Sequence, residues 1–397
     1  MKKTIKLAVV AALALGTTSA FATNGTELIG IGAKARSMGG VGIATSHAGE
    51  NGYNNPAMIS DTENMEVNVG LTYFKPSVSI SAPGGISEDS TRPADILPSV
   101  GFNAKVIDDF YAGIAIYGAA GMGVEYKDIG NSGSGGAGGM SVLNFVVPLA
   151  YKISDFTIAI APKMVRMNQQ QTTYAAGTKT ENLDDTQYGF GADLGVSYTN
   201  SGVTVGAVYK MGTEFDFVMN NQPFGPKDYV MKWGTPATIG LGVSYTMDEH
   251  TIAFDYKLIQ NSGVAGLNGD GKATATEVNP NYNWENQNVF AIGYQYDASV
   301  WAARAGFNYG STPFASGSVS AKEYTDTVDN YFNLPAVTTT HITLGGTYNI
   351  TENHGLDLAF VYGMGEESIE AKDIPVDTKI TATNDQISLT AGYNYKF

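Results

Sequence analysis

Near its amino end the chain carries Gly30-x-Gly32-x-x-Ala35, which has the spacing of a dinucleotide-binding fingerprint. In that motif small residues let a loop approach a pyrophosphate, and the loop follows a β-strand and opens a helix. The surrounding stretch, residues 24–44, contains six glycines, which disfavour a regular helix or strand. Whether it can bind a phosphate therefore depends on what precedes it.

Residues 1–22 have the features of a secretory signal peptide. Three lysines fall within the first six residues, a short apolar stretch follows, and Ala20-Phe21-Ala22 forms a small-residue cleavage site. The apolar stretch is too short and wrongly flanked for a membrane-spanning helix. Cleavage would leave only a few residues before Gly30, so no strand can precede the motif. We therefore reject nucleotide binding.

Other catalytic or metal-binding patterns are weak. The chain has no cysteine, and its four histidines (His47, His250, His341 and His354) are scattered without metal-ligand spacing. The segment 268–277 lacks the glycine placement of a calcium-binding EF-hand loop. His341 is predicted to face inward, which gives no support to a surface lipase. We expect a non-enzyme without cofactor or metal.

Composition narrows the class of protein. A net charge of −15 argues against a nucleic-acid partner, and an exported chain without cysteine cannot rely on disulfides. The chain is rich in glycine (48) and tyrosine (23), only 15% of its residues are charged, and after the signal peptide it lacks the ~18-residue apolar run of a membrane helix. These features favour a transmembrane β-barrel, although a soluble secreted all-β protein has a similar composition.

Alternation with period two is the decisive pattern. In the last segment, QISLTAGYNYKF, apolar residues from Ile387 to Phe397 occupy one face and polar or small residues the other. Its aromatic end resembles the terminal signature of bacterial outer-membrane barrels. Similar segments predict fourteen strands, at 64–82, 94–106, 109–126, 140–152, 155–170, 186–199, 202–218, 229–247, 250–262, 284–297, 300–310, 338–350, 354–369 and 384–397.

The connections between these segments alternate between short turns and long loops. An outer-membrane barrel has short periplasmic turns and longer extracellular loops, so both termini are expected on the periplasmic side. Tyrosines near the predicted periplasmic strand ends suit a membrane interface better than a sandwich core. They are Tyr198, Tyr245, Tyr296, Tyr348 and Tyr393.

Residues 24–60 resemble the N-terminal hatch of the FadL/TodX family of outer-membrane channels for hydrophobic compounds. A second similar stretch is 97–126, whereas the C-terminal half is similar in architecture only. The matching marks are Asn24-Gly25, Leu28-Ile29-Gly30, Gly32, Ser37, Met38-Gly39-Gly40, Ala44 and Asn55-Pro56-Ala57.

The resemblance implies a hatch (23–62) inside a fourteen-stranded barrel (63–397), ligand capture at the outer loops, an interior site, and a kinked third strand that releases ligand sideways. The alternatives are a disordered linker for the hatch, a plain turn for Asn-Pro-Ala, and wall packing for the strand glycines. The hatch residues are Leu28, Ile29, Gly30, Gly32, Met38, Gly39, Gly40, Asn55, Pro56 and Ala57; the kink residues are Gly118, Gly121, Met122 and Gly123.

Two groups of residues are weaker candidates for substrate binding. A carboxylate ligand would need an unpaired cation beside an apolar pocket. Alternation places several cations inward, from which we select three, although it cannot tell which is free. Aromatic residues on the long loops would either capture ligand or form a loop core. The candidates are Lys232, Lys257 and Arg304, and Phe224, Phe314 and Phe332.

We therefore expect a monomeric barrel in the outer membrane of a Gram-negative bacterium, with membrane lipid and a hydrophobic small molecule as its partners. Its function would be passive uptake of long-chain fatty acids or of aliphatic or aromatic hydrocarbons. A general diffusion porin is the first alternative, which a hatch in the lumen disfavours. A surface adhesin or phage receptor is the second, and a hydrolase the last.

Overall fold

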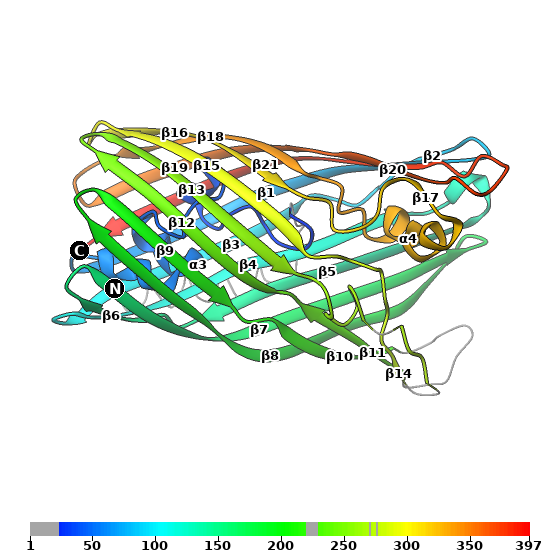
Figure 1. The fold of residues 1–397 in the computed structure, drawn as a ribbon, viewed down its shortest axis with the longest axis horizontal. Coiled ribbons are helices and arrows are strands. Elements are labelled where there is room, and N and C mark those ends of the chain that lie inside the picture. Colours follow the sequence, from blue (N-terminus) through cyan, green and yellow to red (C-terminus); the bar gives the residue numbers. More distant parts are fainter. Residues whose placement is uncertain (1–23, 220–228, 270, 275–276) are drawn as a thin grey trace.

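The computed structural model describes residues 24–219, 229–269, 271–274 and 277–397. The predicted signal peptide and Phe224 lie outside these residues. The described chain forms a closed antiparallel barrel of fourteen membrane-spanning strands, which confirms the predicted fold (Figure 1). The barrel closes where β21 pairs with both β1 and β19. None of the helices in the described part is long and apolar enough to cross a membrane.

Four of the fourteen strands are interrupted, so that each is built from two labelled pieces (β5 with β6, β9 with β10, β11 with β12, and β19 with β20). The strands are β1 (Met65–Ala82), β2 (Ile86–Asp89), β3 (Asp95–Ile107), β4 (Phe110–Tyr126), β5 (Ser134–Val146), β6 (Leu149–Ile153), β7 (Phe156–Ala175), β8 (Thr178–Asn200), β9 (Val203–Lys210), β10 (Thr213–Met219), β11 (Tyr229–Thr235), β12 (Ala237–Met247), β13 (His250–Gln260), β14 (Glu277–Val278), β15 (Gln287–Asp297), β16 (Trp301–Gly310), β17 (Gly317–Val319), β18 (Thr340–Asn349), β19 (His354–Met364), β20 (Glu366–Ala371) and β21 (Ile380–Lys396). The helical segments are α2 (Ala33–Ser37), η1 (Ala48–Glu50), α3 (Asn51–Asn54), η2 (Pro56–Asp61), η3 (Ile129–Asn131) and α4 (Ala321–Asn333).

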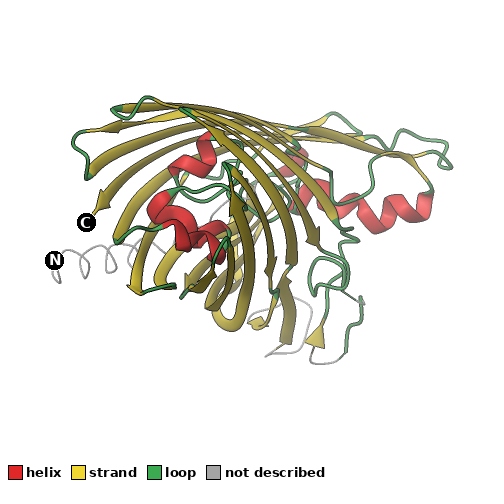
Figure 2. Cartoon of the chain, turned by 60° about the vertical axis from the view of Figure 1, so that its left-hand side comes forward, coloured by secondary structure: helices red, strands yellow, loops and turns green. Residues whose placement is uncertain are grey.

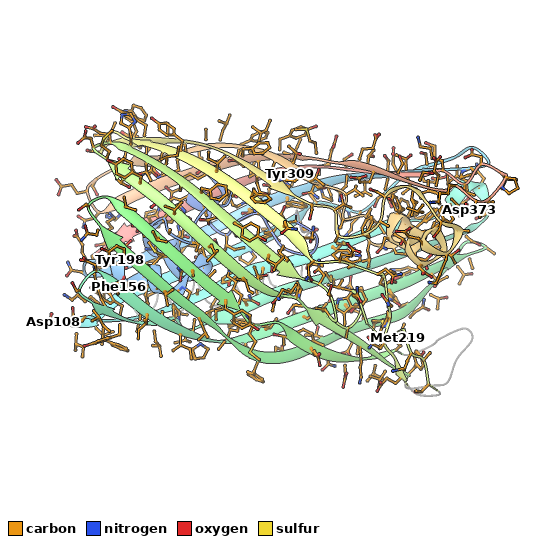
Figure 3. The ribbon with its side chains drawn as sticks, viewed as in Figure 1. Asp108, Phe156, Tyr198, Met219, Tyr309 and Asp373 are labelled. Carbon is orange, nitrogen blue, oxygen red and sulfur yellow. The ribbon has the colours of Figure 1, made fainter. Side chains whose placement is uncertain are left out.

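Alternation along each strand separates an apolar outer face from a polar lumen. On β21, Ile387 and Leu389 are about half exposed on the outside, whereas Ser388 and Thr390 are each only 2% exposed. This arrangement is the one expected for a strand between lipid and lumen. Aromatic side chains gather at the short-turn end, where the rings of Phe156 and Tyr198 lie 4.6 Å apart (Figure 3).

The strand interruptions change which residues face the lumen. The sequence predicts one strand over 229–247, but β11 and β12 are separated at Pro236. Before this break Met231 and Trp233 are buried, and after it Thr238 is buried, so the inward parity shifts by one residue. The predicted inward position of Lys232 is therefore wrong, because it lies on the opposite face from Met231 and Trp233.

Two long connections differ from the sequence prediction. Residues 171–185 were expected to be a loop, but β7 and β8 continue as a hairpin that turns at residues 176–177. The connection 311–337 contains the helix α4, which was not predicted. Ser320 caps this helix by accepting a hydrogen bond from the amide of Glu323. That Ser-x-x-Glu spacing is a recognised helix start and could have revealed it.

The N-terminal segment, residues 24–62, lies inside the barrel toward the short-turn end, whereas α4 lies at the long-loop end (Figure 2). Its short helices contact strands on several sides of the lumen, among them β18, β19, β7 and β8. Its largest apolar side chains, such as Ile29, Met38 and Ile43, are at most 1% exposed. The segment is therefore packed as a core element of the fold.

Candidate functional site: the lumen and the irregular strand β4

Glycines on both the segment and the wall allow the N-terminal segment to pack closely. Gly39 and Gly40 both have positive φ, and a Cβ on Gly40 would lie 1.9 Å from the carbonyl oxygen of Ile29. Opposite them, a Cβ on Gly306 of the wall would lie 2.1 Å from the amide nitrogen of Gly39. Only glycine leaves space for these two backbones to meet.

Polar side chains of the wall bind the backbone of the segment. The Asp255 carboxylate accepts hydrogen bonds from the amides of Gly42 (2.8 Å) and Ile43 (3.0 Å). The Thr343 hydroxyl accepts from the amide of Gly39 and donates to the carbonyl of Ser37. These contacts satisfy backbone groups that water cannot reach.

Within the segment, the buried Glu50 joins one helix to the next. Its carboxylate accepts hydrogen bonds from the amides of Ala33 (2.9 Å) and Lys34 (3.1 Å) at the start of α2. Complete burial, with the negative charge of Asp357 as a second cause, raises the pKa of Glu50 to about 8, although these amides lower it. The buried carboxyl therefore takes up a proton more readily than an exposed one.

The Asn55-Pro56-Ala57 triplet forms a turn inside the segment and also joins it to the wall. The Asn55 side chain accepts from the amide of Ala57 (3.0 Å) and donates to the carbonyl of Ile43 (2.7 Å). A Cβ on Gly195 of β8 would lie 2.2 Å from the Asn55 side chain. The triplet is therefore a helix cap at a tight contact with the barrel wall.

A lumen cavity of about 80 Å³ lies between the segment and the wall. Its apolar side includes Leu28, Ile31 and Tyr117. Its polar side includes Lys163, Lys210 and Lys257 and the carboxylates of Glu27 and Asp255. The cavity is thus amphipathic, with apolar and charged surfaces facing the same space.

The three lysines differ in their partners. Lys163 forms a buried ion pair with Asp193 (2.6 Å). Lys210 donates to the carbonyl of Tyr53 (3.0 Å), and Lys257 donates to the carbonyl of Ile29 (3.4 Å). Across the chain that the structure describes, neither Lys210 nor Lys257 forms an ion pair with a carboxylate within 4 Å. Both ammonium groups therefore keep donors for another acceptor.

Of the three predicted cations, only Lys257 lines this cavity. Arg304 lies nearer the short-turn end, where it donates to Gln295 (2.6 Å) and Thr347 (2.7 Å). Lys232 pairs with Glu277 (3.1 Å). Lys210 was not among the chosen candidates. Alternation predicts that it faces inward, but the sequence carries no signal that it lacks a carboxylate partner.

Strand β4, which corresponds to the third strand predicted from the sequence (109–126), is irregular where the cavity reaches the wall. Its pairing with β3 ends at Tyr117, and its register with β5 shifts between Gly118 and Ala120. Beyond this point the segment supplies hydrogen bonds to the open edge: the Leu28 amide donates to the carbonyl of Ala119 (3.4 Å) and the Gly121 amide donates to the carbonyl of Thr26 (3.2 Å). The segment therefore covers an edge that β3 leaves unpaired.

The predicted kink residues surround this irregularity. A Cβ on Gly118 would have only ordinary contacts with Leu97, at 3.6 Å, so the site has space. A Cβ on Gly123 would lie 2.6 Å from the guanidinium of Arg92, so this glycine is tightly covered. Met122 is buried on the long-loop side. That these residues form a lateral opening stays a prediction.

The two aromatic candidates within the described residues, Phe314 and Phe332, do not line the lumen cavity. Phe314 is 5% exposed and packs against Trp284 and Tyr331, with ring centroids 6.1 and 5.4 Å away. Phe332 is half-buried against the same cluster. The sequence left two alternatives for these residues, ligand capture or a loop core. Phe314 belongs to a packed loop core.

A closed barrel with an apolar outer face is the architecture of bacterial outer-membrane proteins. Residues 8–397 match the family described as outer membrane protein transport protein (OMPP1/FadL/TodX), so the chain belongs to this family, as the resemblance predicted. Its place is accordingly the outer membrane.

Individual relatives are distant. The 47 kDa outer membrane protein of Pasteurella multocida (strain Pm70) is 22% identical over 387 residues, covering 86% of this chain and 87% of the relative. The long-chain fatty acid transport protein of Escherichia coli (strain K12) is 27% identical over 236 residues, covering 49% and 52%. The crystal structure of the Pseudomonas putida toluene transporter TodX has a TM-score of 0.68 at 17% identity, covering 94% of this chain and 100% of that one. At that identity the structural likeness shows the fold.

The contact between Gly306 and Gly39 predicts a sensitive position. In Gly306→Ala the added methyl group would overlap the segment's backbone, which we expect to weaken docking by about 1–3 kcal/mol. Planar-bilayer recordings should then show higher ion conductance than wild type. The control is Gly138→Ala, because a Cβ there meets nothing within 4 Å. Wild-type conductance in a correctly folded Gly306→Ala protein would contradict tight packing at this contact.

Proposed function

We propose that this protein carries hydrophobic small molecules passively across the outer membrane. The observation that best supports this function is that three structural features meet at one place in the barrel wall. The lumen cavity, the irregular part of β4 and the backbone of residues 26–28 all come together at Ala119 and Ala120. In this proposal the N-terminal segment acts as a hatch, and ligand leaves the lumen sideways into the membrane.

The residues that line the lumen cavity and the names of similar proteins both indicate a hydrophobic substrate. The apolar side of the cavity suits a hydrocarbon, and the names of two similar proteins refer to long-chain fatty acids and to toluene. A general porin is disfavoured because residues 24–62 are packed across the lumen. Long-chain fatty acids and aliphatic or aromatic hydrocarbons are therefore the proposed substrates.

Passage would require the hatch to shift. An apolar cavity that holds benzene has a volume of roughly 150 Å³, whereas this one measures about 80 Å³. The bonds at Ala119 and Gly121 join the hatch to the open edge of β4. A shift of residues 26–28 would widen the cavity and uncover this edge together. Unpaired backbone groups are tolerable there because they face the lumen or the ligand.

Transport in reconstituted vesicles tests the proposal. We expect proteoliposomes with a lipopolysaccharide outer leaflet to take up labelled oleate or toluene faster than protein-free vesicles, with little gain in sugar entry. The lipopolysaccharide leaflet is needed because phospholipid bilayers are already permeable to hydrophobic solutes. Rapid sugar entry without any gain in hydrophobic uptake would instead identify a general diffusion channel.

A carboxylate ligand would be bound by the lysines of the cavity. In Lys257→Met the loss of one charge-assisted hydrogen bond should weaken oleate binding roughly tenfold or more, while toluene uptake stays unchanged. Lys232→Met is the matched control, since Lys232 lies on the other face and pairs with Glu277. Equal oleate binding by both variants and wild type would remove Lys257 from the site.

A further inference from the structure

A second cavity, of about 330 Å³, lies at the long-loop end of the same wall. We call it the neutral cavity, because none of the described residues that line it is an aspartate, glutamate, lysine, arginine or histidine. It follows the lumen cavity along β4: Ala120 lines the lumen cavity and Met122 lines the neutral cavity. A molecule that moves from the loops to the lumen along this wall would pass through it.

Three buried polar atoms that line the neutral cavity have no hydrogen-bond partner among the described residues. They are the indole N–H of Trp233 and the side-chain carbonyl oxygens of Gln169 and Asn182. These residues are 2%, 5% and 9% exposed, respectively. Burying such an atom without a partner is costly, so each is a place where a ligand or water gains a hydrogen bond.

A second buried indole at this end of the barrel has a hydrogen-bond partner. The indole of Trp284, also fully buried at this end, donates to Asn330 at 2.7 Å. The amide nitrogen of Asn182 donates to Thr173 at 2.6 Å, which holds the side chain while its oxygen stays unpaired. The unpaired indole of Trp233 thus contrasts with the satisfied indole of Trp284, and the unpaired oxygen of Asn182 is held in place by the bond of its own amide nitrogen.

The rest of the lining mixes apolar residues with uncharged polar side chains, which are Gln170, Gln171, Thr172, Thr173 and Asn333. Met122 and Met140 face each other as cross-strand partners, and Leu334 contributes from the end of α4. The ring of Tyr282 lies 6.2 Å from that of Trp233. Flexible methionines accept ligands of different shape. The cavity therefore combines apolar side chains with uncharged polar ones, and one donor and two acceptors among its polar groups are unpaired.

We propose that the neutral cavity binds the uncharged polar head group of an amphiphile, such as a fatty alcohol or a fatty amide. A hydroxyl or primary amide both donates and accepts, which matches the indole N–H and the two carbonyl oxygens. A carboxylate cannot donate, and none of the described residues that line the cavity is a cation; the nearby Arg92 lies against Gly123 and donates to the carbonyl of Gly138. Burial of a carboxylate is therefore less favourable there than burial of a neutral head group. This inference rests on the proposed function and extends its substrates to neutral amphiphiles.

The test is calorimetric titration of the full barrel in lipid nanodiscs, with empty nanodiscs subtracted. The ligands are 1-octanol, octanamide, octanoate and octane. We expect wild type to bind 1-octanol and octanamide more tightly than octane or octanoate. Gln169→Leu should raise the Kd for 1-octanol and octanamide about fivefold, the value of one neutral hydrogen bond.

Two further variants make the result specific. Trp233→Phe removes the donor and should also raise the Kd for 1-octanol, without raising that for octane. Gln187→Leu is the matched control, because Gln187 lies on β8, donates to Asp185 (2.8 Å) and does not line the neutral cavity. Each variant is first checked for the heat-modifiable gel mobility of a folded barrel.

The proposal is overturned if wild type binds 1-octanol no more tightly than octane, or if Gln169→Leu binds 1-octanol as wild type does. Either result would mean that the polar atoms are only hydrated. Toluene uptake by wild type in the lipopolysaccharide vesicles distinguishes failure of the neutral site from failure of the proposed transport function. Uptake with no preference for 1-octanol refutes the neutral site alone, whereas absence of uptake refutes the transport proposal.

Discussion

Every backbone amide and carbonyl inside a membrane needs a partner, and on one edge of β4 the neighbouring strand stops providing one. Pairing with β3 ends at Tyr117, whereas β4 continues to Tyr126. The chain's own N-terminal segment supplies bonds to Ala119 and Gly121 from inside. Wall and lumen are therefore coupled, because the element that fills the lumen also completes the wall.

This coupling explains why the segment has its composition. Its backbone must approach the wall at several places, and Gly39 and Gly40 allow this at positions where a larger residue would overlap neighbouring backbone. The wall has a glycine, Gly306, at the point of contact, and wall side chains such as Asp255 accept hydrogen bonds from amides of the segment. A glycine-rich sequence that looks like a phosphate loop is thus explained by close packing inside a barrel.

The sequence predicts the barrel well because the alternation of period two is local and repeats in every strand. It fails where a break shifts that alternation. At Pro236 the shift turns Trp233 inward and Lys232 away, so the sequence selects the wrong residue of an adjacent pair. The helix α4 was missed within a long loop, although Ser320 and Glu323 carry its capping signal.

The partners of buried groups were beyond sequence analysis for a different reason. Lys163, Lys210 and Lys257 are all inward by alternation, yet only the first meets a carboxylate, which depends on contacts between distant strands and the segment. The unpaired atoms of Trp233 and Gln169 are likewise a property of the packed structure. Composition and spacing give no information about such three-dimensional partners.

The most direct test of the coupling is to lock residue 27 of the segment to β4. Glu27 and Ala120 form an antiparallel bridge, and residues in such a bridge are close enough for a disulfide. The natural chain has no cysteine, so Glu27→Cys combined with Ala120→Cys gives a single possible bond. The account predicts that the oxidised protein loses uptake of toluene and oleate in lipopolysaccharide vesicles and recovers it on reduction. Equal uptake by the oxidised and reduced forms would contradict it.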